Sequence, residues 1–285
     1  MQRTRPGRTR HLLAGAPRRG PGLTRLGLLA VVVAALTGCA TSGAAPWGSR
    51  ATLAPGLRVI ADAAVDAAKA PEVWGSLLAA GALQIGGADD NVSDWASKKT
   101  PLFGSQSDAV SAGDTIVDVG TGLMIATALA TPSSPEVGRA VRDKGAGLAL
   151  AGAAVLATKG ATDVLKAATG RTRPNGSDDE SLPSSVASLA AVQYALAARN
   201  VESMTASRSA RLGARAGAYG TSLLAGWARV EARKHHPSDV LVGVALGTFV
   251  ARFVSNAFIE PGGPTLEAHV DPGGDMVAMR LGMHF

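Results

Sequence analysis

The sequence predicts an all-α protein, a bundle of about six core helices followed by a short C-terminal β-hairpin. Alanine and glycine are abundant, with 35 glycines, whereas aromatic residues make up only 4% of the chain. The alternation of β-branched residues that is typical of strands is scarce before the last 25 residues. Such a composition favours helices that pack closely through small residues, and the chain is long enough for one sizeable domain.

The first 38 residues have the pattern of an export signal. Seven arginines and no acidic residue precede the apolar run 28–36, and small residues then lead to Cys39. The order Leu36-Thr-Gly-Cys39 resembles a bacterial lipobox, in which the cysteine carries lipid after cleavage. We therefore expect a signal peptide over 1–38, a lipid on Cys39 and a flexible tether over 39–56. A plain signal anchor with an incidental cysteine is the alternative.

The basic charge of the chain belongs mainly to this signal. The whole chain has 28 Lys and Arg against 22 Asp and Glu, a net charge of +6, and removal of seven arginines leaves 21 against 22, or −1. A nearly neutral protein has no large basic surface for a nucleic acid, so we expect no such partner. Cys39 is the only cysteine, which excludes an intramolecular disulfide.

Apolar periodicity and helix-end signals divide the rest of the chain into a helical domain over 57–260 and a tail over 261–285. The polar stretch 88–108 is expected to be a loop. Alternating residues on both sides of 271–275 predict the β-hairpin. The expected helices are 57–69, 72–85, 111–130, 135–168, 183–199, 207–234 and 238–258.

Apolar run length bears on whether these helices cross a membrane, for which about 20 apolar residues are needed. A long uncharged run in the helical part is 119–135, and charged residues such as Lys159 and Arg252 interrupt other helices. The expectation is a bundle that is soluble in itself and held by lipid in the bacterial cell envelope, at the periplasmic face or outer membrane. The slightly positive mean hydropathy leaves an integral membrane protein as the alternative.

Three separated segments carry residues suited to phosphate chemistry. Lys166 is followed seven positions later by Arg173 and Pro174, and both cations suit phosphate oxygens. The stretch 181–188 opens a helix with serine hydroxyls and free backbone N–H groups, an arrangement that binds anions. Arg229, His235 and Asp239 form the third segment, where the histidine and the aspartate lie one helical turn apart. Such a pair can serve catalysis, or can simply cap the helix.

The three segments resemble the phosphatidic acid phosphatase type 2/haloperoxidase superfamily. Its signatures are Lys-x6-Arg-Pro, Pro-Ser-Gly-His and Ser-Arg-x5-His-x3-Asp, in this order. The first is matched in full, and the third is matched with Ala228 in place of serine. The second is degenerate, because Ser185 and Val186 stand where the family has glycine and histidine. The resemblance covers about 60–260 and implies a helical bundle with the motifs gathered at one end.

The resemblance also implies roles for single residues. Lys166, Arg173 and Arg229 would hold the phosphoryl oxygens, with help from Ser184 and from Ser185 through its backbone N–H. His235 would be the nucleophile, and Asp239 would orient its ring. No metal or other cofactor is implied. The partner would be a phosphate-bearing small molecule or lipid, with the membrane reached through the lipid anchor.

The missing histidine leaves the function divided between two classes. Val186 cannot protonate a leaving group, and general acid catalysis contributes ~10²–10⁴-fold. His236 and the loop acids Asp178, Asp179 and Glu180 are the candidate replacements, each with an ordinary structural explanation. The sequence thus favours a phosphatase acting through a phosphohistidine and weakened at the leaving-group step. The alternative is an inactive relative that binds phosphate-bearing ligands or serves as a scaffold, and a vanadate-dependent haloperoxidase ranks behind both.

Overall fold

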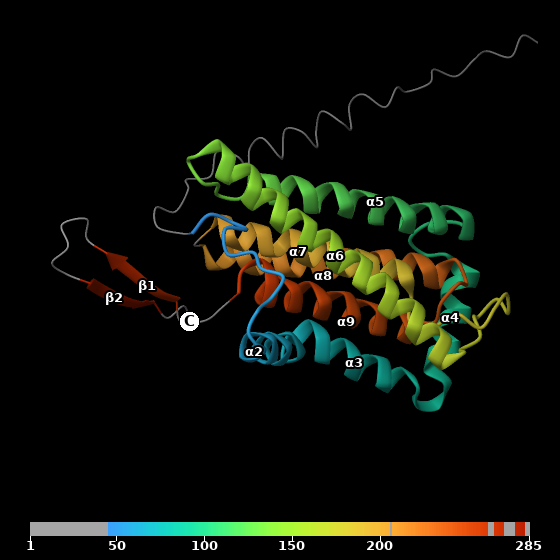
Figure 1. Ribbon diagram of the computed structural model, residues 1–285. Coiled ribbons are helices and arrows are strands. Elements are labelled where there is room, and N and C mark those ends of the chain that lie inside the picture. Colours follow the sequence, from blue (N-terminus) through green and yellow to red (C-terminus); the bar gives the residue numbers. More distant parts are fainter. Residues whose placement is uncertain (1–44, 206, 262–264, 271–276, 283–285) are drawn as a thin grey trace, which may run out of the picture. The chain divides into compact units, whose positions relative to one another are not determined.

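The computed structural model describes residues 45–205, 207–261, 265–270 and 277–282. This part of the chain is dominated by eight α-helices (Figure 1). The all-α prediction is confirmed, but the helices number eight where about six core helices were expected. They are α2 (Leu57–Ala68), α3 (Pro71–Leu83), α4 (Ala88–Lys99), α5 (Gln106–Ala130), α6 (Val137–Thr169), α7 (Ser185–Met204), α8 (Arg208–Glu231) and α9 (Pro237–Val254), with a 3-10 turn at Ile85–Gly87 and a π-helical turn at Ser255–Ile259.

Helix α4 occupies the stretch that the sequence analysis took for a loop. Gly86 and Gly87 have φ of 65° and 71°, in the left-handed region where glycine is favoured, and they turn the chain from α3 into α4. Two aspartates lie in the first turn of α4 and two lysines in its last turn. These charges stabilise the helix ends, so a stretch with few apolar residues still forms a helix.

Helices α7 and α9 pack directly against each other through small residues, as the composition predicted. A Cβ atom added at Gly243 of α9 would lie 2.7 Å from the Ser184 carbonyl oxygen of α7. Ser184 and Ser188 are both fully buried at this contact. The close approach brings the first turn of α7 beside the first turn of α9, where the sequence motifs lie.

The chain before α2 lies against the bundle in its described part, although a flexible tether was expected there. The indole of Trp47 is only 3% exposed, and the Lys144 Nζ lies 5.3 Å from its ring. The Trp47 N–H donates to the Pro132 carbonyl at 3.0 Å, and the Thr52 N–H donates to that of Phe258 at 2.9 Å. The signal peptide and Cys39 lie outside the described residues.

Three of the described helices are long and apolar enough to cross a membrane: Gln106–Ala130, Val137–Thr169 and Pro237–Ile259. The expectation that every apolar run is too short is therefore wrong. It counted uncharged residues only, but a long helix can carry a few charges, particularly in pairs such as Lys159 and Asp163, whose Nζ and Oδ2 atoms lie 2.8 Å apart. The apolar stretches of the first two helices are only 22% and 28% buried within the protein. These findings favour the integral-membrane alternative over a soluble bundle.

Strands β1 (Thr265–Val270) and β2 (Val277–Gly282) pair antiparallel, with Thr265 opposite Gly282 and Val270 opposite Val277. The residues that would form the turn, 271–276, lie outside the described part. The complete C-terminal hairpin therefore stays a prediction.

Candidate active site

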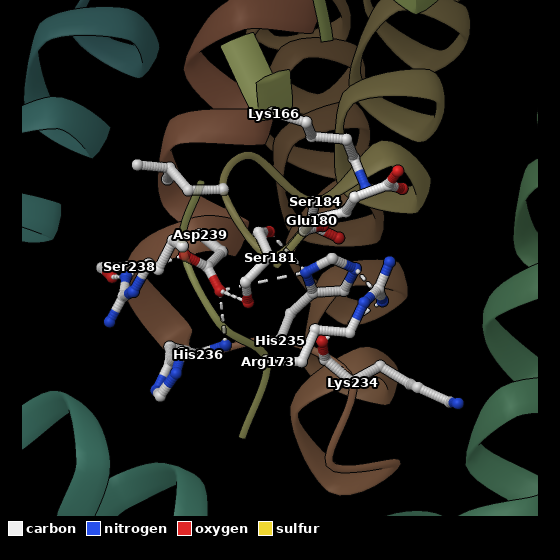
Figure 2. A network of polar contacts seen from close by, with 12 residues as sticks. Lys166, Arg173, Glu180, Ser181, Ser184, Lys234, His235, His236, Ser238 and Asp239 are labelled. Atoms are coloured by element: carbon white, nitrogen blue, oxygen red, sulfur yellow. Dashed lines mark hydrogen bonds and ion pairs between the residues drawn. The ribbon is translucent and has the colours of Figure 1, made fainter. Parts of the chain in front are cut away.

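The predicted site residues come from four helix ends that meet at one end of the bundle. Lys166 lies in the last turn of α6, Ser185 at the start of α7, Arg229 in the last turn of α8, and Asp239 in the first turn of α9. His235 lies in the short connection between α8 and α9, and Figure 2 shows its ring between the side chains of Arg173 and Ser181. The grouping that the motifs predicted is thus present in the structure.

The loop between α6 and α7 places Arg173 and Ser181 beside this histidine. Gly170 ends α6 in the left-handed conformation, with φ of 53°. The loop then turns back on itself, because the Arg173 N–H donates to the Asp178 carbonyl at 3.0 Å and the Ser181 N–H donates to the Arg171 carbonyl at 2.9 Å. The two bonds fix a compact loop whose sides both reach the site.

The His235 ring is buried, held on one side and approached by a cation on the other. Its Nδ1 lies 2.7 Å from the Ser181 carbonyl oxygen, which can only accept, so Nδ1 carries the proton. Its Nε2 is then an acceptor and lies 3.3 Å from Arg173 Nη1. Burial, followed by the positive charge of Arg173, lowers the pKa of His235 to about 3. The ring is therefore neutral near pH 7, with a lone pair on Nε2.

Asp239 does not make the direct contact with the His235 ring that the resemblance implied. Its Oδ2 lies 3.9 Å from His235 Nδ1, but accepts hydrogen bonds from Ser181 Oγ at 2.5 Å and from the His236 N–H at 2.7 Å. Its Oδ1 accepts from Arg171 Nη1 at 2.7 Å. Asp239 thus reaches the ring through Ser181, which contacts the carboxylate with its hydroxyl and the ring with its carbonyl.

The three predicted phosphate-binding cations all have partners within the chain. Lys166 Nζ donates to the Glu180 carbonyl at 2.7 Å (Figure 2). Arg173 Nε donates to Asp178 Oδ1 at 2.5 Å. Arg229 Nη2 is paired with Asp114 of α5, and its Nε is buried without a hydrogen-bond partner. A phosphate would therefore exchange places with carboxylate and carbonyl oxygens that already lie on these cations.

A comparison with known protein families agrees with the motifs found in the sequence. Residues 147–260 match the family model described as the PAP2 superfamily. The matched segment contains all three sequence motifs, whereas Asp89 and Asp114 come from helices that precede it. No curated protein matches the sequence significantly.

Among solved structures, the chain is similar to one titled the first transmembrane PAP2 type phosphatidylglycerolphosphate phosphatase from Bacillus subtilis. The identity is 22%, the TM-score is 0.45, and the match covers 65% of this chain and 92% of that one.

The residues at the degenerate second motif are held by the packing of α7. Ser184 is fully buried, its Oγ has no hydrogen-bond partner, and its N–H donates to the Asp239 carbonyl at 3.0 Å. Ser185 begins α7. Val186 packs at the edge of the apolar cluster of Ala190, Tyr194 and Ala225, so this position strengthens the contact of α7 with its neighbours.

None of the replacements considered for the missing acid is placed well for that role. The His236 side chain points away from the ring of His235 (Figure 2), and its Nδ1 lies 3.3 Å from Asp90 Oδ1. The hydrogen bond from Arg173 lowers the pKa of Asp178 to about 2, so this carboxyl carries no proton near pH 7. Asp179 accepts from Thr172 Oγ1 at 2.6 Å. Glu180 contributes its backbone carbonyl to Lys166.

Three further groups at the site were missed by the sequence analysis: Asp89, Arg171 and Ser181. Asp89 and Ser181 are 3% and 0% exposed. Arg171 lies two positions before Arg173, within the first motif, but the motif itself assigns it no role. No group of three or more His, Cys, Asp or Glu side chains that could hold a metal ion occurs in the described ranges.

Proposed function

We propose that this protein is a membrane-embedded phosphatase that cleaves phosphate esters or diphosphates through a phosphohistidine on His235. The observation that carries the proposal is the neutral, buried ring of His235, which has Nδ1–H on the Ser181 carbonyl and Nε2 on the side of the cations. A nucleophile needs a lone pair in a fixed direction, and this arrangement supplies one.

The reaction divides into two displacements at phosphorus. In the first, the Nε2 lone pair forms a bond to phosphorus while the bond to the leaving oxygen breaks. In the second, water attacks the phosphohistidine, the P–N bond breaks, and phosphate and a proton are released. Lys166, Arg173 and Arg229 stabilise the charge on the phosphoryl oxygens in both steps. No cofactor takes part in these steps.

Val186 limits the substrates that suit this site. A leaving group of high pKa requires a proton as it departs, whereas a phosphate leaving from a diphosphate, with a pKa of about 6, does not. The site therefore favours diphosphates and aryl phosphates over simple alkyl esters. A phosphate-bearing lipid is a suitable substrate class, because α5, α6 and α9 would place the protein within a bilayer.

A second function has a specific observation in its favour. The cations and His235 are retained, but His236, Asp178, Asp179 and Glu180 are not placed to donate a proton in place of the family's histidine. An inactive relative that binds phosphate-bearing ligands, or acts as a scaffold, would have the same ligand-free structure.

Hydrolysis by the full chain in detergent micelles decides between the two functions. Phosphate release is measured for p-nitrophenyl phosphate, an alkyl phosphate and a diphosphate, with His235→Ala as the test and His236→Gln as the matched control. A phosphatase loses activity in the first variant and retains it in the second. Binding of inorganic phosphate without turnover of any of these substrates would favour the inactive relative.

The anchoring of the protein is proposed to depend on its own helices. Export to the cell envelope and lipid on Cys39 remain predictions from the N-terminal sequence, and the lipid would add to an attachment that already exists.

A further inference from the structure

A continuous set of buried polar contacts leads from α4 to the ring of His235. Asp89 Oδ2 accepts a hydrogen bond from Arg171 Nη2 at 2.7 Å, and Arg171 Nη1 donates to Asp239 Oδ1 at 2.7 Å. Asp239 Oδ2 accepts from Ser181 Oγ at 2.5 Å, and the Ser181 carbonyl lies 2.7 Å from His235 Nδ1. Each link joins a group from a different part of the chain, so the set connects α4, the α6–α7 loop and the start of α9.

Arg171 is the centre of this set because it neutralises two carboxylates at once. The Asp89 and Asp239 side chains are 4% and 0% exposed, and neither could stay ionised there without a cation. The planar guanidinium directs one nitrogen to each carboxylate. Although burial opposes it, hydrogen bonds from Ser238 and then Arg171 hold the pKa of Asp89 below its ordinary value.

The contacts of Asp89 show that Arg171 is itself held in place. Ser238 donates to Asp89 twice, through its N–H to Oδ1 at 2.9 Å and through its Oγ to Oδ2 at 2.5 Å. Arg171 Nη1 also lies 2.7 Å from the same Ser238 Oγ. The guanidinium therefore has a fixed direction, which is required of a group that orients another.

We infer that Arg171 is a positioning residue for the phosphoryl transfer proposed above. Anchored by Asp89, it keeps the Asp239 carboxylate on Ser181, so that the Ser181 carbonyl holds Nδ1 of His235 and Nε2 stays directed to phosphorus. Arg171 holds Oδ1 of Asp239, while Oδ2, which lies 3.9 Å from Nδ1, is held by Ser181 and His236. Without Arg171 the carboxylate is free to turn, and we expect it to move onto Nδ1.

The change of partner has a measurable consequence. A carboxylate on Nδ1 favours the protonated imidazolium, whereas a neutral carbonyl does so much less. The other charged groups that influence the ring are Lys166, Arg173 and Arg229, and none of them changes when Arg171 is substituted. Loss of Arg171 should therefore raise the pKa of His235, and a merely structural role would not.

The test uses the full chain in detergent micelles, labelled with ¹⁵N-histidine, and follows the ring nitrogens of His235 by NMR across pH. Their signals are assigned by their loss in His235→Gln. The test variant is Arg171→Gln, and the matched control is Arg139→Gln, an exposed arginine paired with Glu136 at the far end of α6. We expect the midpoint for His235 to rise by about one pH unit or more in the test variant, and to stay unchanged in the control.

Kinetics with p-nitrophenyl phosphate provide the second readout. Arg171 does not belong to the proposed phosphate-binding set, so KM should stay nearly constant. We expect kcat to fall by about 10–100-fold, the range found for groups that orient metal-bound histidines. Asp89→Asn, which removes the anchor but keeps the arginine, should change both readouts in the same direction and less strongly.

The outcomes separate this inference from the function on which it rests. If Arg171→Gln lowers the melting temperature but leaves kcat and the His235 midpoint unchanged, Arg171 is structural and the inference is wrong. If that variant does not fold, Arg171→Lys and Asp89→Asn decide by the same readouts. If the wild type hydrolyses nothing, the proposed function fails, and the NMR titration alone still decides whether Arg171 orients the ring.

Discussion

Arg173 Nη1 lies 3.3 Å from Nε2 of His235, the atom that attacks phosphorus in the proposed reaction. Since Nδ1 carries the ring proton, Nε2 accepts and Arg173 donates. The same guanidinium holds Asp178 Oδ1 at 2.5 Å through its Nε. The side chain that should bind phosphate thus contacts the nucleophile and is itself paired with a carboxylate. Substrate binding therefore has to replace both contacts.

Removal of the Asp178 charge should therefore strengthen phosphate binding. We expect Asp178→Asn to lower KM for p-nitrophenyl phosphate and the inhibition constant of inorganic phosphate by roughly twofold to fivefold, the range of a partly exposed ion pair. Asp179→Asn, a neighbouring carboxylate that contacts Thr172 instead of an arginine, is the matched control. Equal effects of the two substitutions would show that general loop charge, and not competition for Arg173, is responsible.

Substitutions at His235 and Asp239 should differ in kind. His235→Ala removes the nucleophile and should abolish turnover, and it should also lower the melting temperature, because the buried ring and its hydrogen bond to Ser181 are lost. Asp239→Asn leaves Arg171 and Ser181 without their carboxylate, and it should cut kcat by about 10²-fold or more. Breaking a buried ion pair costs ~3–5 kcal/mol, so thermal unfolding of this variant should also move to lower temperature. Measurable turnover in His235→Ala at the wild-type rate would refute the mechanism.

The low pKa of His235 sets the expected pH dependence. The reactive neutral ring is the form above the pKa of about 3, so kcat/KM should show no loss from His235 protonation between pH 8 and about 5. The folded-state pKa lies below the ordinary value of 6.5, so the unfolded chain binds this proton first. The stability contribution is complete above pH 6.5 and is lost as the pH falls towards 3. A decline of kcat/KM near pH 6.5 would contradict this expectation for His235. If the decline disappears in an active variant of another titratable residue, that residue is responsible for it.

The motif spacing predicted which residues meet, but not how they contact one another. Lys166, Arg173, Arg229 and His235 come together as expected, because the first and third motifs each span the end of a helix and the loop that follows it. The role of Ser181 depends on its backbone carbonyl, which no side-chain motif records. Asp89 is separated from Arg171 by 82 positions, in a stretch whose polarity suggested a loop. Pairing between such distant charges leaves no periodic signal in a sequence.

The prediction of a soluble bundle failed for a related reason. It counted each charged residue separately and took no account of pairs such as Lys159 and Asp163. We expect the Cys39→Ala variant to remain in membranes after carbonate washing and to need detergent for extraction, because α5, α6 and α9 are long and apolar enough to supply the attachment. Metabolic labelling with a fatty acid tests the lipid separately, and the label should be lost in this variant. Release of unlabelled Cys39→Ala protein by carbonate would restore the soluble, lipid-held bundle.

The degenerate second motif should have its largest effect on the departure of the leaving group. An alkoxide, whose conjugate acid has a pKa of roughly 16 if it resembles water, needs a proton to depart, while phosphate and aryl oxides do not. The wild type should therefore have a higher kcat/KM for a diphosphate or p-nitrophenyl phosphate than for an alkyl phosphate. The double variant Val186→His with Ser185→Gly should raise alkyl ester hydrolysis much more than diphosphate hydrolysis. Its imidazole would replace a valine that packs beside Ala190 and Tyr194, so a lower melting temperature should accompany the gain. Equal gains on both substrates would mean that another group already supplies the proton.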